Sequence, residues 1–256
     1  MPVRDSVPVG APIWIDLATH DQAASRAFYT DLLGWECEEP DPELGGYANF
    51  SKGDERVAGC VPAMPGMPDA WGVYLATEDA EKTCAQVLAA GGAVYAPAMD
   101  VGDLGVMAIV ADPSGAPFGL WQPGTHRGLV TLAEPGHAAW FELHTADFTQ
   151  TLRFGRDVFG WDTTTVADSP DFRYATGSVD GAEVVGVMEA RTTRPEGPTG
   201  TTAPQWAVYL QVEDVDAALV RAVELGATTV HPPHDSPYGR LVALTDPTGA
   251  LVKLVG

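Results

Sequence analysis

Apolar and polar side chains alternate along residues 12–19, PIWIDLAT, and this period of two predicts a β-strand. The alternation places Ile15 and Leu17 on one face of the strand and Trp14 and Asp16 on the other. We expect the aliphatic face to pack against a helix. The opposite face carries an indole and a carboxylate, and we do not expect it to be covered by that helix.

A change of period to about four residues follows at once and predicts that helix. Asp21 is a suitable N-cap, Ala24, Phe28 and Leu32 recur at four-residue spacing, and Gly34 suits the left-handed position that ends a helix. The helix is therefore expected between Asp21 and Gly34.

The same sequence pattern occurs twice in the chain. FYTDLLGWE at residues 28–36 returns as FGRDVFGWD at residues 154–162, and the two tryptophans are 161−35 = 126 residues apart. WIDLATHD, WGVYLATEDAEKTCAQVLAAGGA and ADPSGAPFGLW have counterparts in WFELHTAD, WAVYLQVEDVDAALVRAVELGAT and TDPTGALVKLV. One insertion of about nine residues in the Pro-, Gly- and Thr-rich stretch 190–205 explains most of the drift in spacing. The pattern indicates a domain duplication.

The later part of each copy has its own signals. A second helix is expected from Asp79 to Gly91 and from Asp214 to Gly226. The sequences DPSG and DPTG predict type I turns between hairpin strands. Each copy thus follows the pattern βαββ and then βαβββ. We divide the chain into a first domain at residues 1–123, a linker at 124–137 and a second domain at 138–256.

The composition of the chain excludes several classes of binding partner. The net charge is −21, with 14 Lys and Arg against 35 Asp and Glu, so binding to nucleic acid or to anionic membranes is not expected. No segment has the length and apolarity of a membrane span or a signal peptide, and we expect a cytoplasmic protein. The three cysteines have no metal-binding spacing, and phosphate-binding and nucleophile motifs are absent from the sequence. A small molecule is the expected partner.

In these motifs the chain resembles the vicinal oxygen chelate superfamily, which includes glyoxalase I, bleomycin-resistance proteins and extradiol dioxygenases. THDQAASRAFYTDLLGW, VYLATEDAEKTCAQVLAAGG and VADPSGAPFGLW carry the likeness, together with their second copies. The resemblance implies an α+β fold of two tandem glyoxalase-like domains. Each domain would consist of two βαβββ units whose curled mixed sheet forms a cup.

Metal-dependent members of that superfamily hold a divalent ion in the cup by His, Gln or Glu side chains. The positions that the resemblance assigns to these ligands are Trp14, Gly72 and Gly119 in the first copy and Trp140, Ala207 and Lys253 in the second. None offers an imidazole or a carboxylate, and a lysine ammonium repels a cation. We therefore expect neither a metal nor another cofactor.

Aromatic residues fall on the inward faces instead, and predict two π-rich cups suited to a planar ligand. The predicted ligand-binding residues on these faces are Trp14, Asp16, Tyr74 and Trp121 in the first cup and Trp140 and Tyr209 in the second. The competing interpretation is that the rings simply fill the cups as core.

The second cup carries the candidate chemistry. Glu142 and His144 lie two residues apart on the inward face of one strand, where the first copy has Asp16 and Ala18. A carboxylate and an imidazole so placed can share a proton, orient a ligand or act as acid and base. They can equally be satisfied by neighbouring groups.

The stretch HPPHDSPYGR at residues 231–240 is expected to be a proline-stiffened loop before a strand. Tyr238 and Arg240 could form the rim of the second cup and face a ligand, or the loop could be an exposed connection. A metal site built from Glu142, His144, His231 and His234 is an open alternative that their spacing does not call for.

Two functions follow as hypotheses. The first is a metal-independent binding protein of the bleomycin-resistance type for an aromatic or cationic metabolite or antibiotic. The second is a lyase, isomerase or oxygenase-like enzyme that acts on an aromatic or polyketide-like substrate through Glu142 and His144. The two copies are expected to pair about an internal pseudo-twofold axis, as a monomer or within a homodimer.

Overall fold

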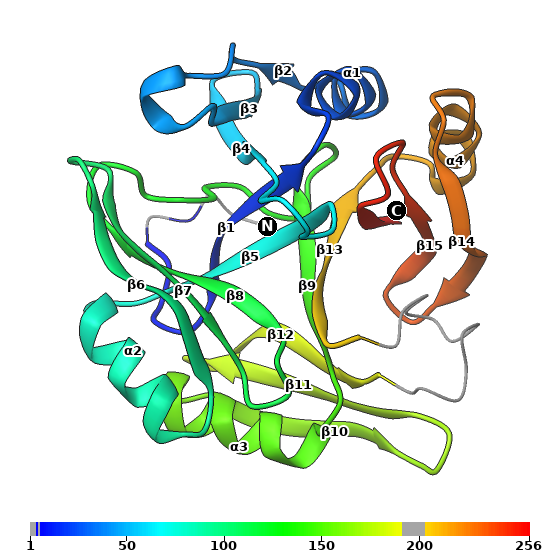
Figure 1. Cartoon of the computed structure of the whole chain (residues 1–256). Helices are drawn as coiled ribbons and strands as arrows, with labels where there is room; N and C mark the ends of the chain where they lie inside the picture. Colours follow the sequence, from blue (N-terminus) through cyan, green and yellow to red (C-terminus); the bar gives the residue numbers. More distant parts are fainter. Residues whose placement is uncertain (1–3, 5, 191–202) are drawn as a thin grey trace.

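A computed structural model describes residues 4, 6–190 and 203–256. The insertion that we expected around residues 190–205 falls largely outside these described residues. Within them the chain forms two eight-stranded mixed sheets and four α-helices, which confirms the duplicated α+β plan (Figure 1).

The first sheet has the strand order β2-β3-β4-β1-β5-β8-β7-β6. At its centre, β1 runs parallel to β4 and antiparallel to β5, and β5 runs parallel to β8. Its strands are β1 (Pro12–Thr19), β2 (Glu36–Cys37), β3 (Ala48–Lys52), β4 (Glu55–Pro62), β5 (Ala70–Ala76), β6 (Ala93–Val101), β7 (Gly105–Ala111) and β8 (Pro117–Pro123).

The second sheet repeats this topology as β10-β11-β12-β9-β13-β16-β15-β14. Its strands are β9 (Ala138–Thr145), β10 (Asp162–Asp168), β11 (Arg173–Val179), β12 (Ala182–Glu189), β13 (Gln205–Gln211), β14 (Thr228–Ser236), β15 (Gly239–Thr245) and β16 (Leu251–Val255). The hydrophobic pattern had given only two strands after the first helix of each copy. The structure adds the edge strands β2 and β10, which are too short or too exposed to alternate clearly.

Each predicted helix cap is confirmed. The helices are α1 (Gln22–Leu33), α2 (Ala80–Ala89), α3 (Phe148–Phe159) and α4 (Val215–Glu224). In each helix the aspartate before the first residue accepts a hydrogen bond from a backbone N–H of the first turn. Gly34 and Gly160 end α1 and α3 in the left-handed conformation.

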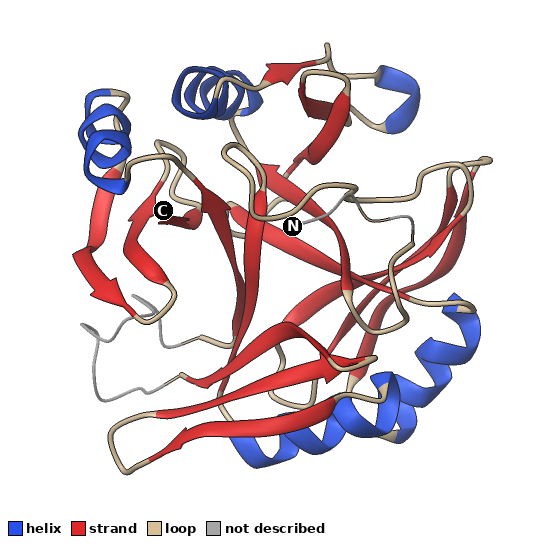
Figure 2. Cartoon of the chain, turned by 180° about the vertical axis from the view of Figure 1, so that it is seen from behind, coloured by secondary structure: helices blue, strands red, loops and turns tan. Residues whose placement is uncertain are grey.

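Helices of opposite halves lie side by side. Figures 1 and 2 show α1 next to α4 at one end of the molecule, and α2 next to α3 at the other. Every helix therefore contacts a helix of the other copy. The two copies form one body in which each half covers part of its partner.

Two reciprocal hydrogen bonds fasten the halves. The indole N–H of Trp35, just after α1, donates to the carbonyl of Gly136 before β9 at 2.7 Å. The indole N–H of Trp161, just after α3, donates to the carbonyl of Gly10 before β1 at 2.9 Å. Donors and acceptors both stand 126 residues apart in the sequence, as an internal pseudo-twofold axis requires.

The aspartates of the two Asp-Pro-x-Gly turns also accept hydrogen bonds from the opposite half. Asp246 accepts a hydrogen bond from Tyr29 of α1 at 3.1 Å, and Asp112 accepts one from Thr151 of α3 at 2.7 Å. All four side chains are buried. Because buried carboxylates are costly without partners, these bonds tie each turn to the opposite half.

One expected loop is a hairpin. Residues 231–236 belong to β14 and residues 239–240 to β15, and a turn joins them. The two strands pair antiparallel, with bulges on either side of His231. The prolines are tolerated because β14 is the edge strand of the second sheet, where a missing N–H breaks no central ladder. In the described part of the chain, no helix combines the length and apolarity needed to cross a lipid bilayer.

Candidate functional site: a buried polar cluster in the second cup

The inward face of the second sheet gathers four polar side chains from three strands. Strand β9 presents Glu142 and His144, β13 presents Tyr209, and β16 presents Lys253. The register places Tyr209 beside Lys253 of β16. Glu142 lies on β9, the neighbour of β13 on its other side. All four are at most 7% exposed, so the cluster lies beneath the surface of the cup.

Lys253 lies at the centre of this cluster. Its ammonium nitrogen is 2.8 Å from Glu142 Oε1 and 2.8 Å from the Tyr209 hydroxyl oxygen. Tyr209 donates to Glu142 Oε2 at 3.0 Å, and the His144 Nε2 atom lies 2.6 Å from Glu142 Oε1. Both carboxylate oxygens are thus engaged, and the buried negative charge is matched by a buried positive charge.

The electrostatics fix the protonation of the cluster. Burial by itself opposes the charge on Glu142, but the Lys253 ammonium and the His144 ring outweigh it and hold the pKa of Glu142 well below its usual range. Burial lowers the pKa of His144, so the ring is neutral at neutral pH. A neutral ring that donates from Nε2 leaves Nδ1 as an acceptor, and Nδ1 has no partner among the described residues.

Aromatic residues lie at the mouth of the second cup. The indole N–H of Trp140 donates to the Tyr174 hydroxyl at 3.1 Å, and both residues are partly buried. Burial and the Glu142 carboxylate raise the pKa of Tyr174, and the nearby Tyr238 adds to the effect. Tyr238 is itself 69% exposed, at the turn between β14 and β15.

Arg240 is not brought to this mouth. Its guanidinium forms ion pairs with Asp216 of α4 at 2.7 Å and with Asp235 at 2.9 Å. Since α4 covers the outer face of the sheet, Arg240 lies on the side opposite to Lys253. His231 and His234 are partly exposed on β14, and each bonds through Nδ1 to the carbonyl oxygen of Pro232.

The first cup holds a related cluster without a lysine. Asp16 Oδ1 accepts hydrogen bonds from the Trp14 indole at 2.8 Å and the Tyr47 hydroxyl at 2.7 Å, and the Tyr74 hydroxyl also donates to Asp16. Burial raises the pKa of Asp16, because no cation lies against it. At the position equivalent to Lys253 this cup has Gly119, where a Cβ would meet the Tyr74 ring at 2.0 Å.

The first cup is also covered by the segment that follows β8. The His126 ring packs edge-on against Trp14, with ring centroids 4.3 Å apart, and against Trp121 at 5.4 Å. Trp121 donates to the His126 carbonyl at 3.0 Å. Burial, and then Arg56, lower the pKa of His126 to about 4, so the ring that covers Trp14 is uncharged.

Comparison with known proteins decides the family. The profile of the Glyoxalase/Bleomycin resistance protein/Dioxygenase superfamily matches residues 12–120 and again residues 136–254. The chain belongs to this superfamily.

Two curated relatives align along almost the whole chain. The anthracycline biosynthesis protein DauV from Streptomyces sp. (strain C5) is 39% identical over 96% of this chain and 93% of its own length. The putative glyoxylase CFP32 from Mycobacterium tuberculosis is 36% identical over 100% of this chain and 98% of its own length.

Solved structures share the fold at lower identity. The Mn(II)-bound glyoxalase from Novosphingobium aromaticivorans has a TM-score of 0.65 at 20% identity, covering 96% of this chain and 82% of that one. The 2,3-dioxygenase LapB from Pseudomonas sp. KL28 has a TM-score of 0.66 at 16% identity, covering 97% and 92%.

The residues in the cups do not fit the metal that several superfamily members carry. Among the described residues, no three His, Cys, Asp or Glu side chains lie together in an arrangement that could hold an ion. In the second cup Glu142 and His144 are adjacent, but the third partner of the carboxylate is the Lys253 ammonium. An ammonium has no lone pair to donate, and it already balances the carboxylate charge. His231 and His234 do not complete a site among the described residues either.

Sequence reasoning brought most of the cup residues together but missed four contributors. Trp14, Asp16 and Tyr74 do meet, as do Glu142, His144 and Tyr209. The missed residues are Tyr47, His126, Tyr174 and the role of Lys253. Lys253 carried a usable signal, since it is a lone charge in the apolar strand LVKLV. Tyr47 and Tyr174 lie at equivalent places in the two copies, which also could have marked them.

Proposed function

We propose that this superfamily member binds a planar, polyketide-like aromatic small molecule in its second cup without a divalent metal. The observation that carries the proposal is the contact between the Lys253 ammonium and the Glu142 carboxylate. The ammonium stands 2.8 Å from the Glu142 carboxylate, at the position that the resemblance assigns to a metal ligand. A fixed cation of the protein thus satisfies the group that could otherwise have drawn an ion into the cup.

The ring environment supports an aromatic ligand in the second cup rather than the first. Trp14 is 3% exposed and covered by His126, whereas Trp140 is partly buried and packs face-on or edge-on against no other ring among the described residues. A partly open indole beside Tyr174 offers a stacking surface with a polar edge. The net charge of −21 favours a neutral or cationic ligand over an anionic one. The relative named as an anthracycline biosynthesis protein agrees in chemical class.

Calorimetric titration with 1,8-dihydroxyanthraquinone in the presence of EDTA tests the proposal. We expect binding that added Mn²⁺ or Fe²⁺ does not strengthen. Trp140→Leu should weaken it roughly tenfold, because an aromatic pair contributes about 0.5–1.5 kcal/mol beyond its buried area. Trp14→Leu is the matched control in the other cup, and should leave the affinity unchanged.

Two results would overturn the proposal. One is a requirement for a divalent ion, and the other is an equal loss of affinity in the two tryptophan variants. The melting temperature of each variant without ligand shows whether the fold is intact, so that a folding defect is not mistaken for lost binding.

A second candidate is proton-transfer catalysis without a metal, and the free Nδ1 of His144 supports it. That atom can accept a proton from a substrate C–H or O–H, while Glu142 holds the ring by its Nε2 side. Deuterium uptake from D₂O into β-tetralone, followed by NMR, would reveal such chemistry. Its loss in His144→Gln would assign the proton transfer to this ring, and equal uptake with and without protein would exclude it for this substrate.

A further inference from the structure

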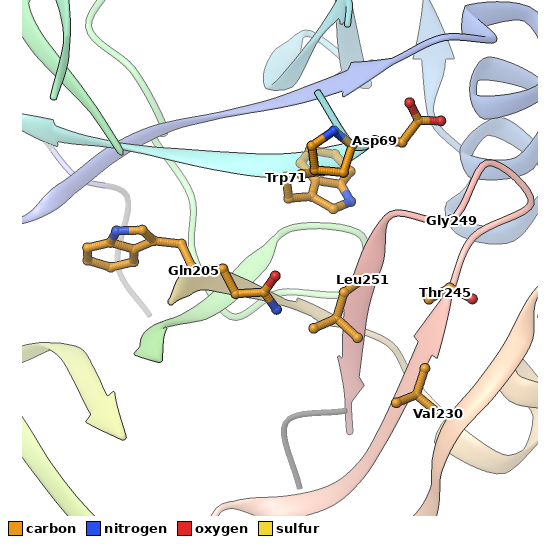
Figure 3. A pocket seen from close by; sticks show the side chains of 10 residues that line it. Asp69, Trp71, Gln205, Val230, Thr245, Gly249 and Leu251 are labelled. Carbon is orange, nitrogen blue, oxygen red and sulfur yellow. The ribbon is translucent and has the colours of Figure 1, made fainter. Parts of the chain in front are cut away.

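A cavity of about 220 Å³ lies where the two halves meet, apart from the polar clusters of the cups (Figure 3). Its first-half wall is the segment that leads into β5, and its second-half wall comes from β13 to β16. The lining residues include Asp69 and Trp71 of the first half and Gln205 and Leu251 of the second.

The second-half wall is an extension of the inward face of the second sheet. Gln205 pairs directly with His144 across β13 and β9, so both side chains lie on the same face. Leu251 precedes Lys253 by two residues on β16 and shares its face by strand alternation. The cavity therefore begins one position beyond the Glu142 cluster, at the domain boundary.

Gln205 supplies an unused donor. Its Nε2 atom is buried and has no hydrogen-bond partner among the described residues. In Figure 3 the amide points toward Leu251 and lies below Trp71. A buried amide without a partner is destabilising, and native proteins rarely keep one unless another molecule satisfies it.

The opposite wall disfavours anions. The Asp69 side chain is 8% exposed and is held by the His20 ring and by the His20 backbone N–H at 3.0 Å. Burial opposes its charge, but hydrogen bonding, first of all to His20, outweighs burial and lowers the pKa of Asp69. A carboxylate thus stands at the rim of the cavity.

We propose that this cavity binds a neutral, single-ring compound that carries a carbonyl group. The carbonyl oxygen accepts the hydrogen bond of Gln205 Nε2, and the ring packs between Trp71 and Leu251. The size agrees, because pockets for drug-sized ligands run from about 300 to 1,000 Å³ and this one is smaller. The site is separate from the stacking surface at Trp140, so it does not depend on the function proposed above.

Three compounds of nearly equal shape test the site on the full chain. Acetophenone offers the carbonyl, α-methylstyrene replaces its oxygen by CH₂, and benzoate adds a negative charge. Binding is followed by NMR through the side-chain amide of Gln205, which is assigned by its disappearance in Gln205→Leu. We expect acetophenone to shift this amide, and the other two compounds to bind at least roughly fivefold more weakly.

Variants separate the hydrogen bond from the fold. Gln205→Leu and the near-isosteric Gln205→Glu both remove the donor, and each should weaken acetophenone binding roughly five- to tenfold. Because these variants lack the amide signal, their affinity, and that of the unaltered chain for comparison, is measured from the broadening of the acetophenone proton signals. Gln150→Leu, on the exposed surface of α3, is the matched control and should bind like the unaltered chain.

The proposal is wrong if α-methylstyrene binds as well as acetophenone, if both Gln205 variants keep full affinity, or if acetophenone leaves the Gln205 amide signal unmoved. The same titrations on Trp140→Leu keep the two proposals apart. That variant should lose the anthraquinone and retain acetophenone.

Discussion

The two cups share one framework, yet they solve the burial of a carboxylate in opposite ways. In the first cup Asp16 receives three hydrogen bonds and no cation, and burial raises its pKa. In the second cup Glu142 receives an ammonium, and its pKa is lowered. The difference traces to one position of the last strand, which is Gly119 in one copy and Lys253 in the other. A single site can thus decide whether a cup holds a charge.

The covers of the cups differ as well. His126 comes from the segment between the sheets and lies against Trp14. Trp140, the counterpart of Trp14 in the second half, is partly buried and packs against no ring among the described residues, although its indole N–H donates to the Tyr174 hydroxyl. A duplicated domain can therefore keep one cup as packed interior while the other stays available.

The largest effect should come from removing the cation of the second cup. Lys253→Met leaves Glu142 buried without its partner, and we expect a loss of about 3–5 kcal/mol in the free energy of unfolding at pH 7. Glu142→Gln combined with Lys253→Met removes both charges and should recover most of the loss. Urea unfolding of the single and double variants measures both. Equal stability of the single and the double variant would show that the unpaired Glu142 charge costs the fold little.

The pH dependence of that variant sharpens the comparison. In the unaltered chain the lowered pKa of Glu142 gives stability above the unfolded pKa, which is lost as the pH falls. Without Lys253, burial raises this pKa, and protonation then favours the folded state. The stability gap between Lys253→Met and the unaltered chain should therefore narrow as the pH falls from 7 toward 4.5.

The cover of the first cup should produce the next largest effect. The pKa of His126 is about 4 in the folded chain and 6.5 in the reference state, so the unfolded chain binds the extra proton between these values. Stability should fall by about 2–3 kcal/mol as the pH drops through this window. His126→Phe should flatten that slope. Parallel slopes in this variant and the unaltered chain would contradict the assignment.

A smaller effect is expected at the position that replaces the lysine. Gly119→Ala would place a Cβ 2.0 Å from the Tyr74 ring, and overpacking of this kind costs about 1–3 kcal/mol. Gly72→Ala lies in the same cup, but its Cβ would meet only the Asp16 carbonyl oxygen at an ordinary 3.7 Å. Thermal unfolding should separate the two alanine variants clearly. Similar losses would mean that the ring moves aside.

The smallest contrast concerns two equivalent tryptophans. Trp71 donates to Tyr29 at 2.9 Å, whereas Trp206 Nε1 has no acceptor among the described residues, because Gly155 stands where Tyr29 does. Replacement by Phe should lower the free energy of unfolding by about 1 kcal/mol more at Trp71 than at Trp206, because only the Trp71 variant loses a hydrogen bond. Denaturant titration of both variants checks this difference, and a larger loss at Trp206 would contradict it.

Local signals made most of the fold predictable. The capping aspartates, the glycines after the helices and the Asp-Pro-x-Gly turns act within a few residues, and the duplication showed each of them twice. The edge strands were harder, because β10 has little apolar alternation. The domain limits at 123 and 138 coincide with the end of β8 and the start of β9, and remain a division that we propose.

The site was less predictable because its contacts depend on register. Lys253 and Glu142 are 111 residues apart in the sequence, and they meet only because β9, β13 and β16 align as they do. Arg240 was expected in a loop, either at the rim of the second cup or in an exposed connection, whereas it lies in β15 and pairs with Asp216 of α4. The proline-rich stretch before it did not indicate a hairpin. His126 reaches the first cup from outside any strand.

The reciprocal bonds of Trp35 and Trp161 have a consequence for how this chain loses its structure. Each half keeps the acceptor that the other half's indole needs, and neither has a complete interior alone. The chain resembles a dimer whose subunits are held at a fixed, very high effective concentration by a peptide connection. Cutting that connection should leave the two fragments associated, and denaturant should melt both in one shared transition.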